Sequence, residues 1–161
     1  MRRSVLCALL ALAFCSVAHA QVVRPAPDFA ISGVAKGTSL KSFRGQAVVL
    51  VVTQRSRGKE FRAMLNRLHD IYSEFSSEKV IFVAAIEDGG TEVPCDIPFV
   101  LASDPAQVAA DYGVNGRFGV AVIGTDGNLD FITGQLVAAE RVRDMVFNNF
   151  ESQTASRKQP L

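Results

Sequence analysis

The sequence predicts a single α/β domain built on a central mixed β-sheet. Ala47–Thr53 (AVVLVVT) and Val80–Ile86 (VIFVAAI) are continuous β-branched and apolar runs, a pattern typical of strands that are buried on both faces. Between them, Phe61–Phe75 has apolar residues at helical spacing, which form a stripe about four turns long that must cover a sheet. A strand, a helix of this length and a second buried strand predict a right-handed βαβ unit.

The second half of the chain predicts smaller elements that complete the sheet. Asp104 followed by proline is a pattern typical of the start of a short helix. The apolar runs Val120–Ile123 and Leu129–Thr133 flank the sequence TDGN at 125–128, and an Asp-Gly pair in this position predicts an antiparallel hairpin. A last helix is expected over about Val137–Phe150.

The first twenty residues have the pattern of a secretory signal peptide. Met1–Arg3 is basic, Val5–Ala18 is apolar and too short to anchor the chain in a bilayer, and Ala18–Ala20 offers small residues to a signal peptidase. We therefore expect a signal peptide at 1–20, one domain at 21–150 and a polar, disordered tail at 151–161. The protein is expected to be exported, into a periplasm or out of the cell, with no transmembrane segment after cleavage.

A second interpretation of the export signal is lipidation. Leu12–Cys15 resembles a lipoprotein cleavage box in which Cys15 would be acylated. The residue before that cysteine should be small, and here it is Phe14. Cleavage after Ala20 is therefore the expected processing, and a lipoprotein is the less favoured alternative.

Charge and cysteine content exclude two classes of protein. The net charge of the chain is +1, and it becomes −1 once Arg2 and Arg3 leave with the signal peptide, which excludes a nucleic-acid binder that relies on bulk positive charge. Cys7 and Cys15 also leave, so the mature chain keeps only Cys95. A single cysteine excludes an internal disulfide framework.

The residue types also argue against a metal centre or a cofactor. His69 is the only histidine after the signal peptide and is interpreted as a surface residue, so the His and Cys sets of usual zinc and copper sites are lacking. Asp126–Asp130 faintly suggests a calcium loop, but it lacks the distal glutamate of an EF-hand and fits a hairpin turn better. No glycine-rich phosphate fingerprint is present, and we expect no cofactor and no metal.

Two blocks of sequence carry a family resemblance that spans Ala26 to about Phe150. The first is Ala26–Phe29 with Leu40–Leu50, and the second is Ile97–Pro105 with Tyr112–Val114 and Val122–Gly127. Together with the order of elements, they resemble the thioredoxin-like superfamily in its peroxiredoxin-like form, the alkyl hydroperoxide reductase and thiol-specific antioxidant, or redoxin, family. This resemblance implies a thioredoxin-like fold with a central mixed sheet flanked by helices.

The sequence departs from this family at the residues that would perform its chemistry. The resemblance implies a reactive cysteine in the loop between the first central strand and the long helix, but Thr53–Glu60 reads TQRSRGKE and contains none. It also implies a cis-proline or an arginine just before the hairpin, where counting places Phe118, with Arg117 beside it. A thiolate mechanism cannot run without its thiolate. We therefore expect a redox-inactive binding or structural module, with an unidentified protein as a possible partner.

Two alternatives from other classes remain open. The first is an enzyme, a thiol-dependent antioxidant or oxidoreductase that uses Cys95, although the acidic residues around Cys95 should raise the pKa of its thiol. The second is binding of an anion or an acidic partner through Arg55, Arg57 and Lys59, which stand where the reactive cysteine would be. The plain interpretation of these basic residues is a solvated turn.

Overall fold

The computed structural model describes residues 24–33, 35–77 and 79–157. The predicted signal peptide at 1–20 lies outside them. In chain order, the elements are β1 (Ile31–Ser32), the 3-10 helix η1 (Leu40–Phe43), β2 (Ala47–Thr53), α1 (Lys59–Ile71), the 3-10 helix η2 (Tyr72–Ser77), β3 (Val80–Ile86), β4 (Phe99–Ala102), α2 (Pro105–Asp111), β5 (Phe118–Ile123), β6 (Leu129–Thr133) and α3 (Ala139–Arg157).

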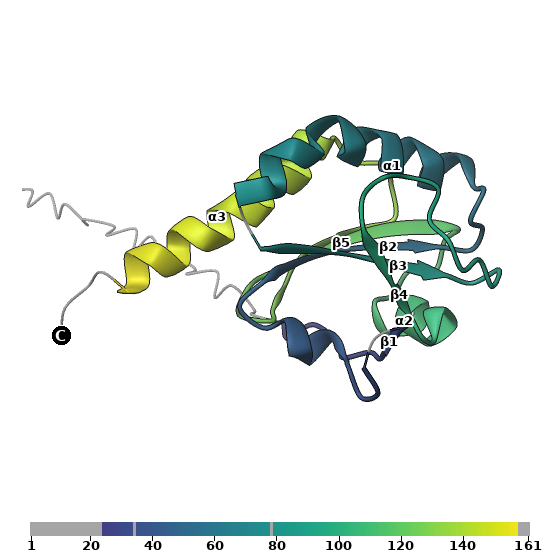
Figure 1. Ribbon diagram of the computed structural model, residues 1–161, viewed down its shortest axis with the longest axis horizontal. Helices are drawn as coiled ribbons and strands as arrows, with labels where there is room; N and C mark the ends of the chain where they lie inside the picture. The colour runs from purple at the N-terminus through teal and green to yellow at the C-terminus, as the bar shows by residue number, and fades with distance from the viewer. Residues whose placement is uncertain (1–23, 34, 78, 158–161) are drawn as a thin grey trace, which may run out of the picture.

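Six strands form one mixed sheet in the order β1-β4-β3-β2-β5-β6. Strands β2, β3 and β4 are parallel neighbours, and the other three pair antiparallel: β5 with β2, β6 with β5, and β1 with β4. Helices α1 and α3 cover one face of the sheet, and α2 and η1 lie against the other face (Figure 1). The predicted mixed sheet, βαβ unit and antiparallel hairpin are confirmed.

The centre of the sheet is β2, in which all seven residues are buried. Alternate side chains of a strand point to opposite faces, so Val49 and Val51 join the core beneath α1 and α3, while Leu50 and Val52 join the core on the side of α2. Because both faces are covered, the strand is apolar throughout instead of alternating. This arrangement explains the uninterrupted AVVLVVT run in the sequence.

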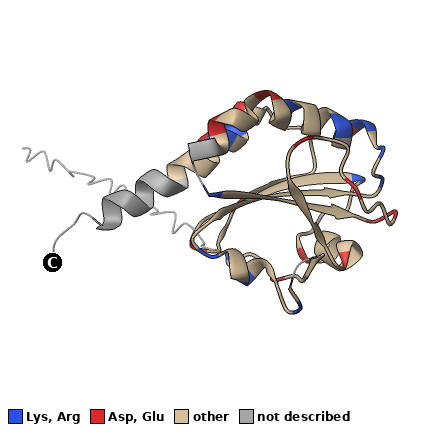
Figure 2. Cartoon of the chain, viewed as in Figure 1, with Lys and Arg blue, Asp and Glu red and all other residues tan. Residues whose placement is uncertain are grey.

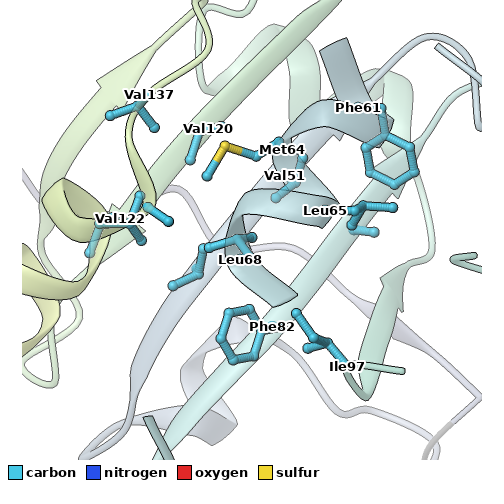
Figure 3. Close-up of a cluster of buried hydrophobic side chains, with 14 of the residues drawn as sticks. Val51, Phe61, Met64, Leu65, Leu68, Phe82, Ile97, Val120, Val122 and Val137 are labelled. Atoms are coloured by element: carbon cyan, nitrogen blue, oxygen red, sulfur yellow. The ribbon is translucent and has the colours of Figure 1, made fainter. Parts of the chain in front are cut away.

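The apolar stripe of α1 packs directly on this sheet. Phe61, Met64, Leu65 and Leu68 are each at most 2% exposed, and Figure 3 shows them gathered over Val51 and its neighbours. The α-helix ends at Ile71 and a 3-10 turn follows, which still brings Phe75 into the core. The sequence pattern predicts one continuous helix to Phe75. A 3-10 helix keeps i and i+3 side chains on one face, so apolar spacing does not reveal the change.

The last helix differs from the prediction in its end. It begins at Ala139 and continues to Arg157, into the segment expected to be disordered from residue 151. Apolar spacing predicts only the part of a helix that packs on a core, whereas local helix propensity can carry the backbone further. Residues 158–161 of the expected tail lie outside the described ranges. Among the helices described, none is both long and apolar enough to cross a membrane.

Candidate functional site

The segment that joins β2 to α1 is fixed at its base by Thr53, the last residue of β2. The Thr53 side chain is only 2% exposed, and its hydroxyl donates to the Arg55 carbonyl at 3.0 Å and accepts from the Arg55 N–H at 3.2 Å. The Gln54 N–H donates to the Arg117 carbonyl at 3.1 Å, which ties the segment to the residue before β5. The β2–α1 loop, residues 54–58, is therefore held to two strands at its start.

The middle of the β2–α1 loop is held by a carboxylate from the end of β3. Asp88 Oδ2 accepts from the Ser56 N–H at 2.8 Å and from the Ser56 hydroxyl at 2.9 Å, and Asp88 Oδ1 accepts from the Gly90 N–H at 3.0 Å. These bonds, led by that of the Ser56 N–H, hold the pKa of the Asp88 carboxyl below its usual value. A Cβ on Gly90 would lie 2.9 Å from the Ser56 Cβ, so the approach requires glycine.

The basic residues predicted as one cluster separate into two groups. Arg55 and Lys59 line a hollow of about 210 Å³ together with Arg117, and its other lining residues are Thr53, Gln54, Gly58 and Glu60. Arg57 lines a different hollow of about 590 Å³ with Arg62, Ser56 and residues 90–94. Figure 2 shows Lys and Arg gathered around the N-terminal end of α1, where both hollows lie. We call the first one the Arg117 hollow.

The cations of the Arg117 hollow are exposed and outnumber the one carboxylate, Glu60, that lines it. Within residues 24–33, 35–77 and 79–157, Arg55, Lys59 and Arg117 form no ion pair. Arg55 acts on Asp88 only through space, as a minor cause of that lowered pKa. Gly58 caps α1 without a side chain, so no side-chain oxygen satisfies the first-turn amides. The Arg117 hollow is therefore locally electropositive.

Phe118 and Arg117 separate at the start of β5. Phe118 is 3% exposed, pairs with Thr53 across the sheet and packs in the core beneath α1. Arg117, one residue earlier, lines the Arg117 hollow instead. All peptide bonds of the described residues are trans. The expected site of a cis-proline or an arginine thus holds a core phenylalanine, and the neighbouring arginine reaches the loop.

Cys95 lies apart from this site. It is partly buried in the connection from β3 to β4, packs on the core beneath α1, and its thiol lies 3.8 Å from the Ile97 carbonyl as a hydrogen-bond donor. Burial is the main cause that raises the pKa of the thiol, and the charge of Asp96 adds to it. The direction agrees with the sequence prediction, but burial outweighs the carboxylate. It lines neither hollow.

The remaining candidate residues, His69 and Asp126, line neither hollow. His69 Nε2 lies 3.9 Å from Asp96 Oδ2, and both side chains are exposed. Asp126 accepts from the N–H and the side-chain amide of Asn128, which fits a hairpin turn. Across the part of the chain that is described, no three His, Cys, Asp or Glu side chains gather as they would around a metal ion.

Comparison with known proteins identifies the fold. No family model and no curated protein matches the sequence. A protein from Chlorobium tepidum described as a thiol:disulfide interchange protein matches with a TM-score of 0.65 and 22% identity, over 79% of this chain and 96% of its own. The chain has a thioredoxin-like fold. A secreted thiol-disulfide isomerase from Corynebacterium glutamicum (TM-score 0.59, 16% identity, 80% and 85% covered) and a 2-Cys peroxiredoxin from Plasmodium vivax (0.57, 16%, 80% and 96%) share it.

Sequence reasoning found Arg55 and Arg57 of the β2–α1 loop and Lys59 at the start of α1, but it missed Asp88 as the anchor of the loop and Glu60 as a lining carboxylate. The Asp-Gly-Gly sequence at the end of β3 was a usable signal, since an aspartate before glycines commonly accepts from nearby backbone amides. Which loop it would bind could not be read from the sequence, because Asp88 and Ser56 meet only when β2 and β3 pair.

Proposed function

We propose that this chain is an exported thioredoxin-like domain that is redox-inactive and acts as a binding module, with the β2–α1 loop at its contact surface. The observation that carries the proposal is the content of that loop: it has no cysteine, and Ser56 in its centre is committed to Asp88. A thiolate is the nucleophile in thiol–disulfide exchange, and nothing else in the loop can replace it. What the loop offers instead is exposed positive charge.

The surroundings of Cys95 support the same proposal against the thiol-dependent alternative. A reactive cysteine needs an accessible thiolate that a nearby cation or a helix N-terminus stabilises. Cys95 has a partly buried thiol, an adjacent carboxylate and a pKa that is raised. It is also the only cysteine that the mature chain would keep, so a disulfide cycle would need a thiol from another molecule.

The proposal is tested by assays of insulin reduction and hydroperoxide consumption on the purified protein and on Cys95→Ser, with an active thioredoxin as positive control. We expect no turnover above buffer from either form. Turnover by the wild type that Cys95→Ser abolishes would establish the thiol-dependent enzyme and end the proposal. Fractionation of cells that express the full chain tests export, and retention of an unprocessed chain in the cytoplasm would contradict that part.

A further inference from the structure

We propose that the Arg117 hollow binds a phosphate group, as inorganic phosphate or as a phosphate monoester. This inference rests on the proposed binding function, and it names the ligand chemistry of that surface. Three side chains would hold the group: Arg55, Lys59 and Arg117.

Two separate parts of the chain bring the cations to one place. Arg55 and Lys59 flank the turn into α1, whereas Arg117 precedes β5, the neighbour of β2 on the other side from β3. The Gln54 N–H to Arg117 carbonyl bond and the Thr53–Phe118 pairing fix the two backbones side by side. The positions of the three cations around the hollow therefore follow from the strand register, not from the chance contact of two loops.

Asp88, whose charge acts on Arg55, forms no direct ion pair with it. Asp88 lies close enough to Arg55 to feel its charge, but its two oxygens accept from Ser56 and Gly90. Glu60 lines the hollow, but forms no ion pair with the cations there. Positive charges at the start of a helix oppose its dipole, so an anion bound there would relieve an unfavourable arrangement.

The charge of the hollow matches a phosphate group. Three cations and the Glu60 carboxylate leave two net positive charges around a space of about 210 Å³. A phosphate monoester carries roughly −1.5 to −2 charges at pH 7, whereas a carboxylate carries about −1. A guanidinium presents paired N–H donors that fit two phosphate oxygens at once. A dianionic phosphate is therefore favoured over a simple carboxylate.

The test is isothermal titration calorimetry of inorganic phosphate into the purified protein at low ionic strength. Arg55→Gln and Arg117→Gln remove cations of the hollow, and Arg57→Gln is the matched control, since it removes the same charge from the same loop but lines the other hollow. We expect Arg55→Gln and Arg117→Gln to weaken binding about tenfold or more, and Arg57→Gln to change it less than about threefold.

Several results would overturn the inference. The first is that the wild type gives no heat of binding with phosphate. The second is that Arg57→Gln weakens phosphate binding as much as Arg55→Gln and Arg117→Gln do, which would indicate an effect of bulk charge. The third is that acetate binds as tightly as phosphate. Titration of glycerol phosphate separates the two sources: tighter binding than inorganic phosphate identifies a monoester, and weaker binding identifies the free anion. Absence of phosphate binding in a protein without redox turnover removes this inference alone, whereas redox turnover overturns the proposed function beneath it.

Discussion

Replacement by valine should have different effects on stability at two buried threonines of the sheet region, because the hydroxyl of only one of them is hydrogen-bonded. Thr53 and Thr125 are both buried, at 2% and 5% exposure. The Thr53 hydroxyl bonds the Arg55 backbone twice, whereas the Thr125 hydroxyl has no hydrogen-bond partner among the described residues. Valine has the same shape as threonine and lacks only the hydroxyl. The pair therefore isolates the contribution of the hydrogen bonds at the base of the β2–α1 loop.

The expected change in the free energy of unfolding depends on which backbone groups lose a hydrogen-bond partner when the hydroxyl is removed. In Thr53→Val, the Arg55 N–H loses its partner, while the Arg55 carbonyl keeps the bond from Gly58 N–H at 2.9 Å. Two lost bonds, with one part-buried donor left without its partner, predict a loss of about 1–2 kcal/mol in the free energy of unfolding. In Thr125→Val no bond is lost and a desolvated hydroxyl is removed, so the stability should stay the same or rise by up to about 1 kcal/mol.

Urea denaturation measures both variants against the wild type. With a slope of about 2 kcal/mol per molar urea, Thr53→Val should lower the midpoint by roughly 0.5–1 M at unchanged slope. Thr125→Val should leave the midpoint unchanged or raise it. An equal loss in both variants would refute the reasoning, because it would show that the hydroxyl bonds to Arg55 do not set the stability of the loop base.

Three further predictions concern a glycine, a carboxylate and the thiol. Gly119→Ala should lower stability by about 1–3 kcal/mol in thermal melting, because its Cβ would lie 2.8 Å from a methyl group of Val114. The pKa of Asp88 is lowered, so its bonds to Ser56 are present above about pH 4 and are lost as pH falls through that lowered value; hydrogen exchange of the Ser56 amide, corrected for its intrinsic rate, should accelerate there. Cys95 should react with iodoacetamide at neutral pH no faster than a free thiol, since its pKa is raised, and fast modification would contradict this.

The central strands of the sheet could be predicted from the sequence because strands buried on both faces consist of apolar residues throughout. The Ala47–Thr53 and Val80–Ile86 runs could be assigned to buried strands with the bounds that the structure has. The end of α3 could not be predicted in this way. Apolar residues indicate where a helix packs on the core, and in α3 they end before the helix does. The polar residues beyond Phe150 therefore predict a tail, although the backbone is helical to Arg157.

The candidate site was only partly predictable for a different reason. Arg55, Arg57 and Lys59 are neighbours in sequence, but a tight turn directs successive side chains to different sides, and only Arg55 and Lys59 share the Arg117 hollow. Arg117 joins them through strand pairing between β2 and β5. Such a contact depends on register, which local sequence does not state. That residues 53–60 contain no cysteine, in contrast, follows directly from the sequence and needs no geometry.

The net charge of the chain gives no hint of this site, and the reason lies in how Asp88 is used. The whole chain carries a net charge of only +1, which does not indicate an anion-binding surface. Asp88 is bound to Ser56 and Gly90 and shapes the loop, so its oxygens form no direct ion pair with Arg55, although its charge acts on Arg55 through space. The Arg117 hollow therefore keeps local positive charge within a nearly neutral protein. Coulomb attraction between exposed groups fades over about 10 Å in salt, so this local balance, and not the total, determines what the loop can bind.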